Sequence, residues 1–501
     1  MRFLLFLSCV FFQRINSYPK DHVEEVFQWK KVEFENLPQP ENSYVGPYPY
    51  YIPENVDVTS AGGYHPASGL FLTITARFRP GIPTSFGAFC VHEYKYLGSS
   101  PKIWGFPNYE MNAFRPEDFA GGSLEENQGS KTKNNAEELR ILENPLNATK
   151  NKDEDEERKG YKNKNQDHGS YGNNPVVQIP IYSKPTYPVA QTKDNTRIIS
   201  VFYTIIDEKC NRALFMDNGQ VVYYRNTTYR IQKPAILVVD LPIDGCETRN
   251  FPIFRRSEIP RRIAQKGPDG YMAPAIDYQS DSCDDFFLYI PNGFYNFFLV
   301  YDYKRDEFWA FDHESFLPVV AESFFVFRKT FHYDLPIGAF AVSLGFPDKY
   351  GDRLAYYTQM AGTAQFSVST RVLKNRRKSP ENYSKYDFRI MGYRGSGHQA
   401  MRTAIDYTYG VMFYSEVQST QIRCWNIHKP LIPDNIVVVF QSKKVQMGIY
   451  IAVDSLGYLW FHSSHIPIDY TTAIPLNLEE VNSRTFRMKI EDAIRGTVCE
   501  N

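Results

Sequence analysis

The chain has 501 residues, of which 43% are apolar, 16% aromatic and 23% charged. This composition excludes a fibrous or wholly disordered protein and allows one large domain or two ordinary ones. The 56 basic and 57 acidic side chains leave a net charge of −1, so the basic excess of a nucleic-acid-binding protein is absent and no nucleic-acid partner is expected.

The first 17 residues have the pattern of a secretory signal peptide. Arg2 precedes an apolar run from Phe3 to Phe12, and a short polar segment ends at the small residue Ser17. The run is too short to span a bilayer, and no later stretch approaches the roughly 20 apolar residues of a transmembrane helix. We therefore expect a secreted, extracellular protein with no membrane partner.

Six cysteines follow the predicted signal peptide: Cys90, Cys210, Cys246, Cys283, Cys424 and Cys499. An even number suits disulfides in an oxidising compartment, and the absence of a Cys-x-x-Cys pair favours bridges over a zinc site. Their connectivity stays open, because six cysteines allow many pairings. Candidate glycan acceptors occur in the Asn-x-Ser/Thr triplets at Asn147, Asn226 and Asn382.

Residues 124–170 are too polar to form a core. They are rich in charged residues and Asn, and Tyr161 is their single aromatic residue. Residues 171–197 regain Val, Ile and Tyr, but their prolines would disrupt a central strand. We predict one largely disordered insertion at 121–197, which interrupts a domain made of residues 18–120 and 198–501.

Short apolar or alternating runs recur through the rest of the chain, separated by turn residues. They are residues 69–74, 198–203, 235–240, 286–290, 298–302, 354–357, 410–414 and 449–454. Each has the length of a strand, and no comparable series of amphipathic helices intervenes. The abundance of Tyr (36), Phe (37), Gly (30) and Pro (32) also favours strands and turns. The sequence therefore predicts an all-β protein.

Three segments share an Asp-rich turn that leads into an aromatic strand: 207–217, 348–357 and 454–461. Small antiparallel hairpins repeated through a long chain are typical of β-propeller blades. The pattern by itself leaves a large β-sandwich as the alternative.

A further set of segments occurs in order from about Gln28 to Cys499 and skips only the insertion. The segments are 76–83, 100–102, 106–112, 283–285, 299–302, 366–375, 410–413, 424–426, 429–430 and 485–499. They resemble the insect Yellow and major royal jelly protein family. The resemblance implies a secreted six-bladed β-propeller with a central tunnel. Members differ in role, among them dopachrome conversion in melanin synthesis, binding of biogenic amines in saliva, and nutritive, structural or eggshell functions, so the fold does not choose the function.

The sequence departs from the family pattern in three places. Residues 463–465 (Ser-Ser-His) stand where the family has Ser-Asp-Arg, and residues 394–400 replace a more polar segment. Cysteines that the family usually carries before Ile198 and Ala235 are absent. We therefore hypothesise that Cys90 and Cys246 supply substitute partners for Cys210 and Cys283.

Asp284 and Asp285 are the candidate catalytic residues. A carboxylate pair at the tunnel mouth would bind an ammonium group or take a proton from a catechol-derived ring. The alternative is structural, with one Asp accepting backbone N–H bonds at the strand entry and the other facing water.

The candidate ligand-binding residues are Asn218, Phe294, Tyr295, Ser369 and Thr370. The aromatic cluster that contains Phe294 and Tyr295, together with residues 324–327, would form a π-rich pocket or pack between blades. Ser369 and Thr370 would line the tunnel or lie within a strand, which the alternation of Phe366, Val368, Thr370 and Val372 predicts. The Asn-Gly pair that begins at Asn218 is first a turn signal. His462 and His465 stand at i and i+3 and would serve a metal or proton-transfer role only if a turn brought them together. In a strand they point to opposite faces, so we predict no metal.

No nucleophile elbow or phosphate-binding loop occurs, and we expect no covalent catalysis and no cofactor. The favoured interpretation is a protein that contributes to pigmentation or hardening of insect cuticle or eggshell. It would bind small catechol or indole amines without turnover and contact extracellular matrix proteins. The alternatives are a dopachrome-converting enzyme, with Asp284 or Asp285 as its base, and a biogenic-amine-binding protein.

Overall fold

The structure is a computed structural model that describes residues 22–36, 58–76, 85–112, 197–223, 227–267, 269–327, 331–465 and 477–500. The predicted signal peptide (1–17), the sequons at Asn147 and Asn226, and the insertion at 121–197 except Arg197 lie outside these residues. Within the described part of the chain, no helix has the length and apolar character needed to cross a membrane.

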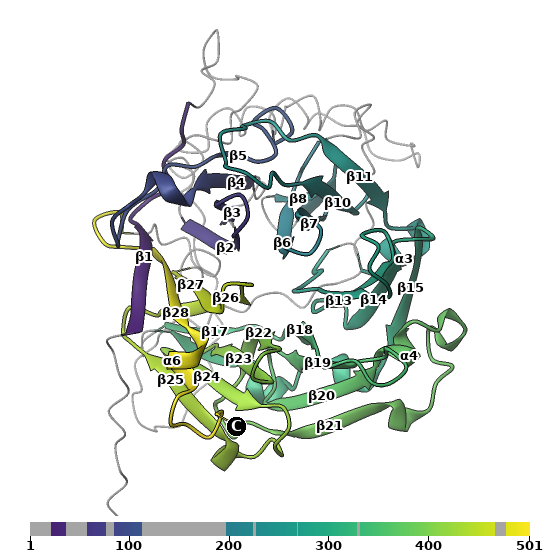
Figure 1. Cartoon of the computed structure of the whole chain (residues 1–501). Coiled ribbons are helices and arrows are strands. Elements are labelled where there is room, and N and C mark those ends of the chain that lie inside the picture. The colour runs from purple at the N-terminus through teal and green to yellow at the C-terminus, as the bar shows by residue number, and fades with distance from the viewer. Residues whose placement is uncertain are drawn as a thin grey trace, which may run out of the picture.

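Six four-stranded antiparallel sheets form the blades of a β-propeller (Figure 1). Blade 1 consists of β2 (Val58–His65), β3 (Leu70–Ala76), β4 (Ser85–Cys90) and β5 (Trp104–Gly105). Blade 2 consists of β6 (Val201–Asp207), β7 (Arg212–Asp217), β10 (Ala235–Asp240) and β11 (Ile253–Glu258). Blade 3 consists of β12 (Ala275–Tyr278), β13 (Phe286–Asn292), β14 (Phe297–Asp302) and β15 (Glu307–Asp312).

The second half of the ring repeats this arrangement. Blade 4 consists of β18 (Ala339–Leu344), β19 (Leu354–Gln359), β20 (Ala364–Ser369) and β21 (Phe388–Tyr393). Blade 5 consists of β22 (Ala400–Asp406), β23 (Val411–Glu416), β24 (Gln421–Asn426) and β25 (Ile436–Gln441). Blade 6 consists of β26 (Met447–Val453), β27 (Tyr458–Ser464), β28 (Ser483–Lys489) and β1 (Val23–Trp29). The all-β six-bladed propeller is confirmed.

Smaller elements connect these strands. Two hairpins lie between strands of the blades: β8 (Gln220–Tyr223) with β9 (Thr227–Arg230), and β16 (Phe324–Phe327) with β17 (Phe331–Asp334). The helices are α3 (Arg261–Ala264), α4 (Thr370–Leu373) and α6 (Ile490–Ile494). The 3₁₀ turns are η4 (Val91–Glu93), η6 (Glu314–Phe316), η7 (Val320–Glu322), η8 (Arg376–Lys378), η9 (Lys385–Asp387) and η10 (Pro433–Asn435).

Burial between neighbouring blades explains the apolar runs of the sequence. Strands β13 and β14 are buried along their whole length, because both faces of a blade pack against other blades. A strand buried on two faces has a continuous apolar run rather than an alternating one. Each of the eight runs predicted as strands overlaps a strand of the structure: β3, β6, β10, β13, β14, β19, β23 and β26.

The Asp-rich turns join the innermost strand of a blade to the next strand. Asp454 accepts hydrogen bonds from the backbone N–H groups of Leu456 (3.0 Å) and Tyr458 (2.8 Å). Asp348 accepts one from the N–H of Tyr350 (2.8 Å). An Asp side chain that satisfies the turn backbone favours a tight hairpin, which accounts for the repeat seen in the sequence.

The two ends of the chain close the ring in blade 6. Strand β1 pairs with β28, with Val23 opposite Met488, and Figure 1 shows the two strands side by side. Glu24 and Arg487 form an ion pair across this seam (2.5 Å). The first described strand thus completes the last blade, which removes two free strand edges.

Three disulfides join Cys90 to Cys246, Cys210 to Cys283, and Cys424 to Cys499. The hypothesis that Cys90 and Cys246 pair with Cys210 and Cys283 is therefore wrong. Cys90 ends β4 and meets the β10–β11 connection, whereas Cys210 and Cys283 lie in turns that face each other from blades 2 and 3.

Candidate functional site

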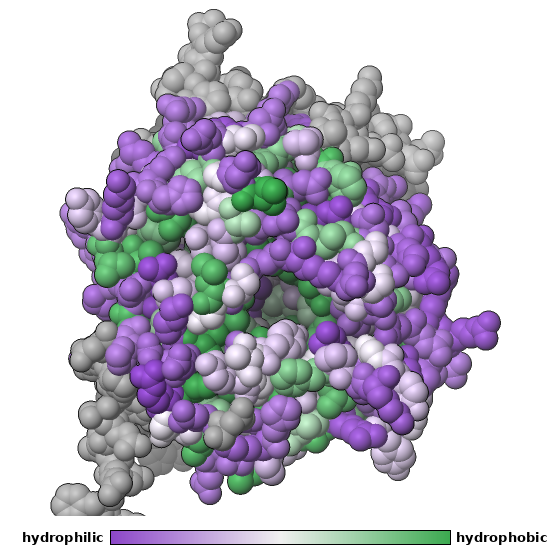
Figure 2. Space-filling model, in the orientation of Figure 1, coloured by the Kyte–Doolittle hydropathy of each residue, from purple (hydrophilic) through white to green (hydrophobic). Residues whose placement is uncertain are grey.

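The innermost strands of the propeller enclose a cavity of about 210 Å³. Its wall combines aliphatic side chains of these strands with four aromatic residues: Tyr64, Tyr407, Tyr450 and Trp460. Figure 2 shows the molecule hollowed near the centre of the ring, with apolar side chains in the hollow. An aromatic wall with a few polar groups is the usual lining of a small-molecule site.

Trp460 gives this wall its rigidity. Its ring lies 5.0 Å from that of Tyr64 and 5.9 Å from that of Phe71, centroid to centroid. Its indole N–H donates to the carboxylate of Asp454 (2.8 Å). The aromatic surface is therefore held in place before any ligand arrives.

Glu208 is a partly buried carboxylate in the lining of the cavity. It lies in the β6–β7 turn and accepts a hydrogen bond from the backbone N–H of Ser455 (3.1 Å). Burial raises the pKa of Glu208, and the charges of Asp454 and Asp207 raise it further. A carboxylate with a raised pKa in a cavity is suited to proton transfer.

Arg402 is the cation of the cavity. It belongs to β22 of blade 5, and one guanidinium nitrogen donates a long hydrogen bond to the backbone oxygen of Thr204 (3.5 Å) in blade 2. The guanidinium lies over the ring of Tyr450, 4.3 Å from its centroid. Because β22 and β6 belong to opposite blades of the ring, the side chain crosses the tunnel.

An apolar cluster occupies the other end of the innermost strands. It includes Tyr203, Met272, Phe340, Met401 and Met447, at or near the beginnings of these strands, together with Met360 after β19 and Phe325 of β16. The cavity residues lie toward the strand ends. Arg402 therefore separates an open cavity from a filled segment of the tunnel.

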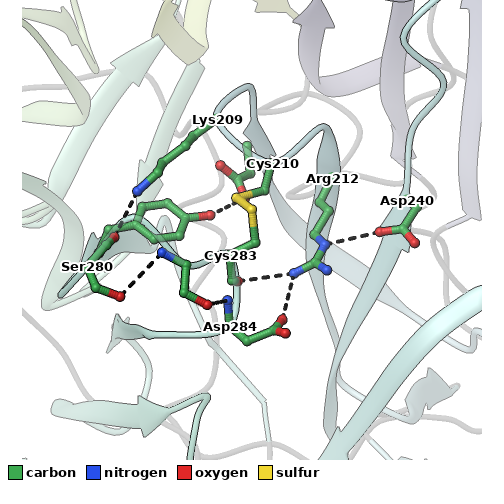
Figure 3. Close-up of a disulfide and its surroundings, with 10 residues drawn as sticks. Lys209, Cys210, Arg212, Asp240, Ser280, Cys283 and Asp284 are labelled. Atoms are coloured by element: carbon green, nitrogen blue, oxygen red, sulfur yellow. Dashed lines mark hydrogen bonds and ion pairs between the residues drawn. A yellow bond between two sulfur atoms is a disulfide. The ribbon is translucent and has the colours of Figure 1, made fainter.

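Asp284 and Asp285 lie outside the lining of this cavity. Figure 3 shows Asp284 beside the Cys210–Cys283 disulfide, with its carboxylate on Arg212 (3.2 Å). Arg212 also pairs with Asp240 (3.0 Å). Asp285 pairs with Lys304 (2.9 Å), and this ion pair lowers the pKa of Asp285. Asp284 thus lies between blades 2 and 3, Asp285 pairs within blade 3, and neither carboxylate lines the cavity.

Asn218, Phe294 and Tyr295 lie toward the filled end of the tunnel. Asn218 is buried in the turn after β7, where Gly219 has the positive φ (64°) predicted for an Asn-Gly turn. Phe294 packs on the cluster that contains Phe325, and Tyr295 packs on the core of blades 2 and 3. The structure thus brings Phe294 and Phe325 together, as part of an apolar core.

Ser369 and Thr370 lie on blade 4 and do not line the cavity. The alternating pattern predicted a strand through Val372, but β20 ends at Ser369, whose side chain caps α4 by accepting from the N–H of Arg371 (3.3 Å). Thr370 is buried and accepts from the N–H of Arg353 (2.9 Å). Local capping ended the strand earlier than its apolar alternation indicated.

His462, and the group of Cys90, His92 and Cys246 that resembles a set of metal ligands, have structural roles. His462 is buried between Thr59 (2.9 Å) and Thr485 (2.8 Å), and burial lowers its pKa to about 4. His92 lies near Cys90 and Cys246, but the two sulfurs are bonded to each other. Asn382, the one sequon within the described residues, is exposed.

Sequence reasoning missed the residues of the cavity: Tyr64, Glu208, Arg402, Tyr407, Tyr450 and Trp460. A signal existed for two of them, because Glu208 and Trp460 lie in the Asp-turn hairpins at 207–217 and 454–461. Nothing near Arg402 or Tyr450 in the sequence indicates that they meet.

Comparisons with known proteins give a family model and several relatives by sequence. A family model described as major royal jelly protein matches residues 199–499. Yellow-related salivary protein ASP4 of Phlebotomus orientalis is 34% identical over 317 residues, which cover 62% of this chain and 76% of the relative. L-dopachrome tautomerase yellow-f of Drosophila melanogaster is 31% identical over 305 residues, which cover 60% of this chain and 68% of the relative. A crystal structure of a protein from Bacteroides thetaiotaomicron is 7% identical, with a TM-score of 0.40. The match covers 93% of this chain and 76% of that protein.

Proposed function

The chain belongs to the major royal jelly protein family, and we propose that it is a secreted protein that binds a small catechol or indole compound in its central cavity. Such binding would contribute to pigmentation or hardening of an insect extracellular matrix, in cuticle or eggshell. The observation that carries the proposal is the aromatic cavity of about 210 Å³. A cavity of roughly 150 Å³ accommodates benzene, so this one suits a single substituted or fused ring system.

Calorimetric titration of the purified secreted protein with dopamine, serotonin and indole tests this proposal. We expect saturable binding of at least one compound by the wild type and at least tenfold weaker binding by Ala404→Phe, because a phenyl ring at this position fills the cavity. The control is Leu317→Phe, which adds the same ring at an exposed position outside the cavity. Binding by none of the three compounds, or equal binding by Ala404→Phe, would contradict the proposal.

The same titrations, together with an assay of dopachrome turnover, distinguish two more specific roles. Tight binding of serotonin or dopamine without turnover would favour an amine-binding protein, a role compatible with the salivary origin of several relatives. Turnover of dopachrome would favour an enzyme. The position and the pKa of Glu208 support this second candidate. It lines the cavity and its pKa is raised by burial, as a base that removes a ring proton requires.

We expect Glu208→Gln to lower any dopachrome turnover at least tenfold, because the amide accepts no proton. Asp284→Asn and Asp285→Asn are expected to leave turnover within twofold of the wild type, since these carboxylates pair with Arg212 and Lys304 outside the cavity. Dopachrome loss followed by absorbance, above its spontaneous rate, measures the effect. Loss of turnover in Asp284→Asn with full activity in Glu208→Gln would instead identify the base first indicated by the sequence.

A further inference from the structure

Arg402 is a buried cation with few partners. Arg402 is 7% exposed, and among the described residues its guanidinium forms one long hydrogen bond, to the backbone oxygen of Thr204 (3.5 Å). Its Nη1 atom has no hydrogen-bond partner among the described residues. The titratable groups that interact with it are the phenols of Tyr450 and Tyr203, with no carboxylate among them. Burial accordingly lowers the pKa of Arg402.

Arg394, another buried arginine among the described residues, shows what a satisfied guanidinium looks like in this protein. Arg394 is 2% exposed and donates to Thr358 Oγ1 (3.1 Å), to the backbone oxygen of Ala364 (3.3 Å) and to Gln365 Oε1. Arg394 lies outside the lining of the cavity, whereas Arg402 lines it. The Nη1 atom of Arg402 that lacks a partner thus belongs to a residue that lines a cavity, where a ligand has room to supply an acceptor.

The rings around Arg402 favour a flat partner. The guanidinium carbon is 4.3 Å from the centroid of Tyr450 and 5.6 Å from that of Tyr203. These cation–π contacts offset part of the cost of burying the charge but leave the in-plane N–H donors free. A carboxylate is the group that matches such donors in geometry and in charge.

We propose that Arg402 is the specificity-determining residue of the cavity and selects an aromatic ligand that bears a carboxylate, whose oxygens accept from the guanidinium. This inference rests on the proposed binding function and adds the charge of the ligand to it. It opposes a cationic amine as the preferred ligand, because an ammonium group beside Arg402 would meet a like charge in a setting of low polarity.

Three probes of similar ring size and different charge test the inference: indole-2-carboxylate, indole and tryptamine. By calorimetric titration of the wild type, we expect indole-2-carboxylate to bind at least tenfold more tightly than indole, and tryptamine to bind most weakly. In Arg402→Met, which keeps a long apolar side chain, the ratio of the indole-2-carboxylate affinity to the indole affinity is expected to fall to about one. Arg402→Lys, which keeps the charge without the planar donors, is expected to retain part of the preference.

The outcomes separate this inference from the proposed function. Equal binding of indole and indole-2-carboxylate by the wild type, tightest binding of tryptamine, or a preference that persists in Arg402→Met would each overturn the inference and leave the binding function intact. Binding of none of the three probes would overturn the inference, and the absence of binding by dopamine and serotonin as well would overturn the proposed function. Thermal unfolding supplies a second readout, because indole-2-carboxylate is expected to raise the midpoint of the wild type and not that of Arg402→Met. Circular dichroism of each variant verifies its fold.

Discussion

Replacing Trp460 with alanine is expected to lower the free energy of unfolding by about 4 kcal/mol, the range for deleting a buried aromatic side chain. Trp460 is 2% exposed and joins two blades, because it extends from β27 of blade 6 onto Tyr64 and Phe71 of blade 1. The change also removes the indole donor of the buried Asp454 carboxylate. Guanidinium unfolding followed by far-ultraviolet circular dichroism measures the loss.

Trp460→Phe is the matched control for this change. It keeps a ring against Tyr64 and Phe71 and deletes the N–H bond to Asp454, so we expect a loss of about 1–2 kcal/mol. The difference between the two variants then reports the packing of the seam between blades 6 and 1. An unfolding free energy for Trp460→Ala within about 1 kcal/mol of the wild type would show that this seam does not depend on Trp460.

Removal of the Cys424–Cys499 disulfide is expected to destabilise the protein by about 4 kcal/mol or more. The bridge closes a loop of 75 residues that contains most of blade 6, and a loop of this length gives about 4 kcal/mol in the chain-entropy model. Both cysteines are fully buried, so the double variant Cys424→Ala/Cys499→Ala also loses packing. Denaturant unfolding without reductant measures the effect.

The Cys210–Cys283 disulfide provides a control of nearly equal loop length. Its sequence separation is 73 residues, but its cysteines are half-buried. Figure 3 shows this bridge. The chain-entropy model gives the same loss of about 4 kcal/mol for Cys210→Ala/Cys283→Ala. We expect the Cys424→Ala/Cys499→Ala variant to be the less stable of the two, and the reverse order would show that burial of the bridge adds nothing.

The sequence alone determined the family, the all-β class and the propeller. The strand runs and the Asp-rich turns are local patterns, in which neighbouring residues alternate or satisfy their own backbone. Residues 286–290 and 454–461 therefore became a strand and a hairpin, as predicted. Where one local signal competed with another, the prediction was wrong: the alternation extended the strand through Val372, but capping by Ser369 ended β20 and began α4 at Thr370.

The tertiary structure alone decided the composition of the candidate site. Glu208, Arg402 and Tyr450 come from blades 2, 5 and 6, and they meet only because closure of the ring brings the innermost strands together. No local sequence pattern predicts that residues from three different blades line one cavity. The adjacent Asp284 and Asp285 suggested a carboxylate pair, but Arg212 from another blade and Lys304 from another turn hold them apart from the cavity. Charge and burial depend on neighbours distant in sequence, and these set the chemistry of the site.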